Sequence, residues 1–467
     1  MRPATIGLTA GLAAAVGVAA ASRGPSLVPW PAGVRRAFPV ITGAGAGLAV
    51  GLTTAAGAAL AQSVTGNGLS NRSGGSGRAW PVRRLLVGGS VAAVAVLGSR
   101  ITAARLLRRM QEQARGLDPG FADGPTDPLV SGSPDSLVPL LALGREGARF
   151  VGSTVCADRI ADVTGQPART SPIRIFVGVD AAPTVPDRVD LAMAELRRTG
   201  AFDRGHLLIQ APAGTGYTNA TGVDVLELLT GGDCATVAVG YGLLPSFLSL
   251  GKVQVAALTQ RLLMEAVRKE LDAGAGGPRV LLYGESLGAK VQQVAIPQGL
   301  RDLDRFGVTS ALWVGTPGSA EADAFAERCT GASITVDRPE QVPDPLPRPR
   351  PRVWFLAHDG DPVVRFRPEL ARRRPDWLPT DGSRGRNVPA GMRFLPGITW
   401  AQALVDTVFA TDVKPGDFRS AGHDYRADLG ALVRFAYDLP ADDGMAARLE
   451  TQLRELELAR ARRIDGG

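Results

Sequence analysis

Short apolar runs alternate with helical patterns from residue 173 onwards. Strand-like runs lie at 173–179, 206–210, 236–239, 278–283, 311–314 and 353–357. Apolar residues recur at helical spacing over 187–199 and 251–271, and a further helical segment spans 429–437. This alternation predicts the α/β class, with a mostly parallel sheet that helices cover on both faces.

The first hundred residues follow a different pattern. Residues 3–22 and 37–71 carry no charged side chain, and 85–99 form a third, shorter apolar run between arginines. A cleaved signal peptide followed by a glycine-rich linker is the alternative interpretation, because all three runs are only mildly hydrophobic. Three such runs with no acidic residue between them favour two or three membrane helices. We therefore expect a multi-pass protein of the plasma membrane.

The charge distribution supports a membrane interface and argues against nucleic acid as a partner. The net charge is +7, but twelve arginines and no Asp or Glu precede Glu112. The first 111 residues thus carry about +12 and the rest about −5 (7 minus 12). Arginines that flank apolar spans are typical of membrane interfaces. Their distribution only slightly favours a cytoplasmic catalytic domain, so the side of the membrane stays open.

Composition changes again between residues 101 and 135, from a basic helical pattern to a segment rich in Pro, Gly and Asp. We expect an N-terminal transmembrane helical domain at 1–110, a linker at 111–135 and a catalytic domain at 136–440. Residues 441–467 carry Met445, Leu449, Leu453 and Leu456 at helical spacing. This last segment is predicted to be an amphipathic helix that docks on the protein.

The chain carries one motif for nucleophilic catalysis, Gly-Glu-Ser-Leu-Gly at 284–288. It follows a strand-like run and precedes a segment that can continue as a helix. This is the context of the nucleophile elbow, in which a serine sits on a sharp turn between strand and helix. Ser286 is therefore the candidate nucleophile. The three cysteines form no close pair, and no disulfide, metal site or cofactor is expected.

A serine nucleophile needs a base and a carboxylate that orients the base. In this fold the chain order is serine, acid, histidine, and only His358 and His423 follow Ser286. His423 lies in a loop between the last strand-like run and the last helical segment, so we favour it as the base and expect His358 to be a packed histidine. Asp359 and Asp361 both follow the strand at 353–357. We favour Asp361 as the acid, with Asp359 as a residue of the turn.

The oxyanion of the tetrahedral intermediate needs two backbone N–H groups. The residue after the nucleophile, Leu287, is predicted to supply one. The loop at 211–216 is predicted to supply the other, from Gly214 or Thr215. This loop is rich in glycine, but it lacks the lysine and the full glycine spacing of a phosphate-binding loop. Asp424 is a poor orienting group for His423, because adjacent residues seldom face each other.

A set of stretches between about 130 and 440 resembles the actinobacterial membrane-anchored α/β-hydrolase family. They include RIFVGVDAAPTV, PAGTGY, GESLGAK, LWVGTPG, HDGDPVVRFRPEL and AGHDY, in the order of that family. The resemblance implies a multi-helix membrane domain before a hydrolase domain, with Ser286 as nucleophile, Asp361 as acid and His423 as base. Two departures stand out: Ala289 and Lys290 follow GESLG where a small polar residue is usual, and the histidine motif lacks a second Gly-His.

Together these patterns predict a membrane-anchored serine hydrolase, esterase-like or lipase-like, that forms an acyl-enzyme on Ser286. The expected substrate is an ester or thioester of an apolar acyl group, because a site tethered to a membrane meets lipids. Two alternatives remain. An acyltransferase would use the same triad and pass the acyl group to an alcohol, and a non-catalytic scaffold would keep only the fold.

Overall fold

A computed structural model of the chain describes residues 3–65, 105, 107–244, 249–274, 276–381, 384–410 and 416–466. The chain forms two compact units. The sheet unit comprises Met110–Arg367, Asp381–Val388 and Thr407–Gly467, and the hairpin unit comprises Met1–Arg109, Pro368–Thr380 and Pro389–Asp406. Residues 368–380 and 389–406 therefore join the N-terminal unit, although they lie within the range predicted for the catalytic domain.

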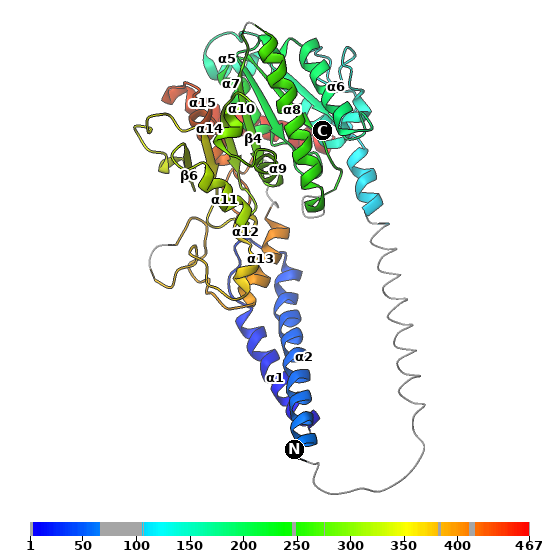
Figure 1. The fold of residues 1–467 in the computed structure, drawn as a ribbon, viewed down its shortest axis with the longest axis vertical. Coiled ribbons are helices and arrows are strands. Elements are labelled where there is room, and N and C mark those ends of the chain that lie inside the picture. Colours follow the sequence, from blue (N-terminus) through cyan, green and yellow to red (C-terminus); the bar gives the residue numbers. More distant parts are fainter. Residues whose placement is uncertain are drawn as a thin grey trace. The chain divides into compact units, whose positions relative to one another are not determined.

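The sheet unit contains a seven-stranded, wholly parallel sheet in the order β1-β3-β2-β4-β5-β7-β6. Figure 1 shows this sheet among its helices. Its strands are β1 Ile173–Val177, β2 His206–Ala211, β3 Cys234–Val239, β4 Arg279–Glu285, β5 Val308–Val314, β6 Ser333–Val336 and β7 Val353–Leu356. The predicted α/β class is confirmed. β1 and β3 are buried along their whole length, as strands covered on both faces must be.

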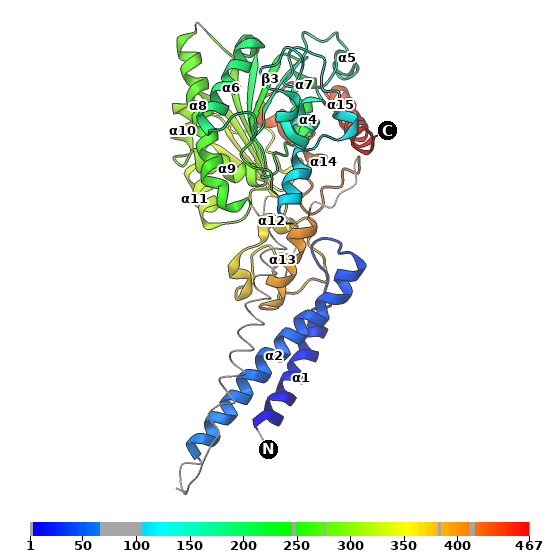
Figure 2. The ribbon, with the colours of Figure 1, turned by 90° about the vertical axis from the view of Figure 1, so that its right-hand side faces the viewer.

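Helices cover both faces of the sheet. Figure 2 shows α6, α8 and α9 on one face and α7, α14 and α15 on the other. The helices of this unit include α4 Gly144–Val151, α5 Ala157–Thr164, α6 Val185–Arg198, α7 Ala220–Leu229, α8 Val253–Ala273, α9 Leu287–Ala295, α10 Leu300–Arg305, α11 Ala320–Arg328, α12 Pro362–Arg365, α14 Arg426–Tyr437 and α15 Asp443–Asp465. Because every strand runs the same way, the loops after the strands gather at one edge of the sheet, where ligands of such folds bind.

A buried charge network ties α15 to the sheet. Arg174 of β1 is fully buried and lies 2.7 Å from Asp224 and 2.5 Å from Glu227, both on α7. Arg460 of α15 lies 2.7 Å from the other carboxylate oxygen of Asp224. Leu449 and Leu453 of α15 are also buried. The predicted amphipathic helix is thus present, and it docks through both apolar and charged side chains.

In the hairpin unit, α1 (Pro3–Ala21) and α2 (Ala32–Thr65) lie side by side (Figures 1 and 2). A Cβ atom on Gly43 would lie 2.6 Å from the carbonyl oxygen of Ala15, and one on Gly11 would lie 2.6 Å from that of Gly47. The helices pack this closely because small residues face each other, as in membrane helix pairs. Large apolar side chains point outward and are exposed, among them Leu12, Ile41, Leu48 and Leu52.

Within the described part of the chain, one helix is long and apolar enough to cross a membrane. It spans Ala32–Ala58 with a mean hydropathy of 1.4, and α1 contributes only a shorter apolar stretch, Leu8–Ala21. The expected multi-pass anchor is thus supported only as far as one candidate span. The third apolar run, at 85–99, lies outside the described residues.

A second contact holds the hairpin unit together. Asp406 lies on α13 (Ile398–Phe409) and is fully buried. Its carboxylate accepts hydrogen bonds from the backbone N–H of Leu27 (3.0 Å) and from Nε1 of Trp30 (2.6 Å). Burial raises the pKa of Asp406 to about 6. The connection between α1 and α2 therefore folds together with a segment almost four hundred residues later in the chain.

Candidate active site

Ser286 lies in the turn between β4 and α9 with φ 56° and ψ −125°. Residues other than glycine rarely adopt this backbone conformation, which costs on the order of 1–3 kcal/mol and is typical of functional sites. Its backbone N–H donates to the carbonyl oxygen of Val314 on β5 (2.9 Å). A Cβ on Gly284 would lie 2.7 Å from Cα of Ala289, and one on Gly288 would lie 2.2 Å from the carbonyl oxygen of Ala211. Both glycines of the motif are thus sterically required.

Asp361 and His423 are brought together at the same edge of the sheet. Asp361 follows β7 and caps α12, where its Oδ1 accepts from the N–H of Val363 (2.8 Å). Its Oδ2 lies 2.7 Å from Nδ1 of His423 and accepts from the hydroxyl of Tyr425 (2.6 Å). Asp361 is fully buried. A carboxylate held in this way fixes both the orientation and the tautomer of the imidazole.

The environment of His423 favours a protonated imidazole. Burial lowers the pKa of His423, but the charge and hydrogen bond of Asp361 outweigh burial, and Glu285 and Asp424 add to the same effect, so the pKa is raised. Its Nε2, the atom that would accept the serine proton, has no hydrogen-bond partner among the described residues. Gly315, with φ 57°, makes room for the ring, because a Cβ there would lie 2.6 Å from Cε1 of His423.

The other candidates from the sequence have different partners. His358 is fully buried, as expected for a packed histidine, with Nε2 2.8 Å from Asp428 and its ring stacked on Tyr425 at 4.0 Å. Asp359 pairs with Arg365 instead of a histidine. Asp424 pairs with Arg426 at 2.8 Å.

A pocket of about 430 Å³ adjoins Ser286 and His423. Its volume is in the range of small-molecule sites. Most of its other lining residues are polar. The full set is Glu146, Gln210, Ala211, Ala213, Thr215, Tyr217, Asn219, Glu285, Asp424, Arg426 and Glu457. Glu457 comes from α15, so the C-terminal helix forms part of the wall.

The predicted oxyanion donors differ in their surroundings. Leu287 is the first residue of α9, and the first N–H groups of a helix have no carbonyl partner within the helix. Thr215 lines the pocket, whereas Gly214 packs against Ser249, whose Oγ would lie 2.4 Å from a Cβ on Gly214. The loop is closed by a hydrogen bond from the N–H of Ala213 to the carbonyl oxygen of Tyr217 (2.7 Å). Thr215 is therefore the better placed of the two loop candidates.

Sequence reasoning missed three residues of this site. Tyr425 holds Asp361, Glu285 lines the pocket and Gly315 makes room for His423. Tyr425 and Glu285 lie inside motifs recognised for another residue, AGHDY and GESLG, and Gly315 lies in LWVGTPG, one of the stretches that carry the family resemblance. Their roles depend on residues far away in the sequence, Asp361, Asn219 and His423, so the motifs located them without revealing their contacts.

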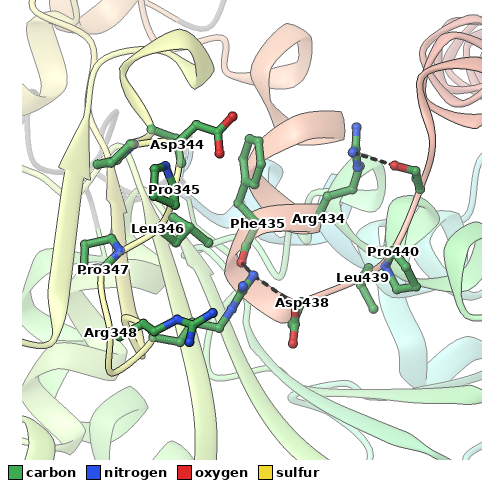
Figure 3. A pocket seen from close by; sticks show the side chains of 14 residues that line it. Asp344, Pro345, Leu346, Pro347, Arg348, Arg434, Phe435, Asp438, Leu439 and Pro440 are labelled. Carbon is green, nitrogen blue, oxygen red and sulfur yellow. Dashed lines mark hydrogen bonds and ion pairs between the residues drawn. The ribbon is translucent and has the colours of Figure 1, made fainter.

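A second pocket, of about 550 Å³, lies between residues 342–350 and the end of α14 (Figure 3). Half of its lining residues are prolines and arginines, and Arg350 donates to the carbonyl oxygen of Phe435 (2.7 Å). Its lining contains no serine, cysteine or histidine. Among the described residues, no group of His, Cys, Asp and Glu side chains is arranged to hold a metal ion. The pocket at Ser286 is therefore the candidate active site.

A parallel sheet with a serine at a strained turn after a central strand, and with a His–Asp pair at the same edge, defines the α/β-hydrolase class. Residues 173–443 match the model of the alpha/beta-hydrolase family, and residues 31–154 match the model of the N-terminus of that family. The chain belongs to this family, which indicates hydrolase activity. Neither the curated proteins nor the solved structures gave a match.

Proposed function

We propose that this protein is a membrane-anchored serine hydrolase that cleaves an ester or thioester of an apolar acyl group. The observation that carries the proposal is the buried His423–Asp361 pair, joined at 2.7 Å, beside a pocket that Ser286 also lines. The strained backbone of Ser286 supports the same reading, because nucleophiles of this fold are held in such a turn.

The reaction follows from these positions. Oγ of Ser286 attacks the carbonyl carbon, and its proton passes to Nε2 of His423. The tetrahedral intermediate carries a negative oxygen, which the N–H groups of Leu287 and of the loop near Thr215 stabilise. When the intermediate collapses, the bond to the leaving alcohol or thiol breaks, and His423 returns the proton to that group. Water then attacks the acyl-enzyme by the same route and releases the acid.

The membrane anchor supports an apolar acyl group. The span Ala32–Ala58 is long enough to cross a bilayer, and only 6% of its apolar window is buried within the protein. In our proposal, α2 crosses the membrane and α1 packs against it through small residues. An enzyme held in this way meets lipid esters at high local concentration.

The catalytic proposal is tested with Ser286→Ala, His423→Ala and the double variant. Members of a working triad act in one step, so their losses do not add. All three variants are expected to retain similar residual activity toward a short-chain aryl ester, roughly 10³-fold or more below the wild type. Ser286→Ala is also expected to abolish covalent labelling by a fluorophosphonate.

Ser333→Ala serves as the matched control, because Ser333 begins β6 and does not line the pocket. Circular dichroism establishes that each variant is folded. A folded Ser286→Ala protein with wild-type labelling and turnover would refute the assignment of the nucleophile.

A further inference from the structure

Most charged side chains around the Ser286 pocket are paired with one another. Arg426 lies 2.8 Å from Asp424 and 2.5 Å from Glu457. Arg149 lies 2.9 Å from Glu146. The lining carries four carboxylates and one arginine, Arg426. Three of the carboxylates, Glu146, Asp424 and Glu457, have an arginine partner.

Glu285, the residue before the nucleophile, is an exception. Its Oε2 accepts hydrogen bonds from Nδ2 of Asn219 (2.6 Å) and from the hydroxyl of Tyr283 (2.8 Å). The side chain is therefore held in one orientation. Its other oxygen, Oε1, has no hydrogen-bond partner among the described residues. Burial raises the pKa of Glu285.

Gln210 supplies a second acceptor on the neighbouring strand. It lies on β2, paired with Tyr283 of β4 in the sheet register, and it also lines the pocket. The residue is 1% exposed, and its Oε1 has no hydrogen-bond partner in the described part of the chain. A buried polar atom without a partner is rare and calls for a ligand or an ordered water.

We propose that this pocket binds a polyhydroxylated alcohol, glycerol-like or sugar-like, which is the leaving group of the ester, with Glu285 and Gln210 as hydrogen-bond partners. The inference rests on the proposed serine hydrolase function. The alcohol of the ester, and not its acyl group, is assigned to this pocket because His423 protonates the leaving oxygen. The pocket wall continues from His423 to Asp424 and Arg426. The wholly apolar side chains of the lining are Ala211 and Ala213, which lie there with the ring of Tyr217, whereas Glu285 and Gln210 offer acceptors for hydroxyl groups.

Three esters of one acyl group test the proposal on the full-length protein in detergent. They are 1-monobutyrylglycerol, butyl butyrate and butyrylcholine, whose alcohols are a polyol, an alkyl group and a cation. We expect kcat/KM for monobutyrylglycerol to exceed that of both other esters by at least about tenfold, because a site built to bind hydroxyl groups rejects analogues that lack them. Free glycerol is also expected to slow fluorophosphonate labelling of Ser286 more than 1-propanol does.

Glu285→Met tests the residue. The preference for monobutyrylglycerol over butyl butyrate is expected to fall at least about fivefold, while Gln298→Met, at an exposed glutamine outside the pocket, keeps it. Retained fluorophosphonate labelling of Glu285→Met establishes that the variant is folded. If Glu285→Met does not fold, the competition between glycerol and fluorophosphonate on the wild type decides whether the pocket binds a polyol. Equal slowing by glycerol and 1-propanol would contradict the proposal.

The failures of the two proposals are distinguishable. Labelled Ser286 with equal turnover of the three esters, or with butyrylcholine preferred, would overturn the polyol site and leave the serine hydrolase intact. Loss of both labelling and turnover in the wild type would remove the proposed function and this inference with it.

Discussion

At the scale of single residues, the site depends on one carboxylate that is bound on both oxygens. Asp361 accepts hydrogen bonds from Val363 on Oδ1 and from Tyr425 on Oδ2, where it also meets His423. Asp359, two residues earlier, pairs with Arg365 outside this network. The two aspartates of one loop therefore have separate roles.

Asp361→Asn is expected to lower kcat by roughly 10³–10⁴, because an amide stabilises the wrong tautomer of the histidine and does not stabilise the imidazolium. Asp359→Asn is the matched control and is expected to change kcat by less than about tenfold. Steady-state kinetics with a short-chain aryl ester measures both. A larger loss in Asp359→Asn would reverse the assignment of the acid.

The pH dependence of kcat/KM follows from the raised pKa of His423. The base must be neutral to accept the serine proton, so activity falls as the pH decreases through this pKa. The midpoint of the acid limb is therefore expected above the ordinary histidine value of about 6.5. Glu285→Gln removes one of the charges that raise it, so the midpoint is expected to move to lower pH. A pH profile from 5 to 9 with a midpoint below 6.5 in the wild type would contradict the prediction.

At the scale of elements, α15 completes both the core and the wall of the pocket. Arg460 binds Asp224 beneath the helix, and Glu457 of the same helix binds Arg426 beside the site. Stability and pocket shape are therefore linked through one C-terminal helix.

Arg460→Met is expected to destabilise the protein by roughly 2–4 kcal/mol, because it removes one partner of the buried Asp224 carboxylate. Arg174 still pairs with Asp224, which keeps the loss below that of an isolated buried charge. Arg462→Met, at an exposed position of the same helix, is the control and is expected to stay within about 0.5 kcal/mol. Urea unfolding measures the free energies. Equal stability of the two variants would show that the buried pair contributes nothing net.

At the scale of the whole molecule, the chain combines a hydrolase unit with an apolar helical hairpin. Asp406 binds Leu27 and Trp30, so a late segment of the chain is built into the N-terminal unit. In a truncated protein that lacks the N-terminal helices, Asp406 would lose Leu27 and Trp30 as partners. The membrane proposal is therefore best tested on the full chain.

The full-length protein is expected to remain in the membrane pellet after carbonate washing. The double variant Leu48→Arg with Leu52→Arg puts two charges on the exposed face of α2, where each costs roughly 2.5–3.5 kcal/mol in a bilayer. It is expected to release a substantial fraction of the protein. Leu141→Arg, at an exposed leucine of the sheet unit, is the control. Release of the wild type by the wash would refute the anchor.

The sequence by itself determined the class of the fold and the location of the candidate site. Six of the seven strands carry apolar runs, because parallel strands are covered on both faces and their pattern is local. The exception, β6, lies at the sheet edge and has one buried residue, Val336, so its sequence carries no continuous apolar run. Ser286, Asp361 and His423 were located because glycine spacing, strand ends and chain order are all visible along the chain.

Only the tertiary structure decided which side chains share a contact. Tyr425 reaches Asp361 across 64 residues, and Trp30 reaches Asp406 across 376. Arg174 interrupts an apolar strand, and its carboxylate partners lie on α7. Such contacts depend on how strands and helices pack in space. The spacing of residues along the sequence does not show which of them lie close together in the fold. The candidate acid and base were therefore predictable from the chain, whereas their hydrogen-bond partners and the polar lining of the pocket were set by packing.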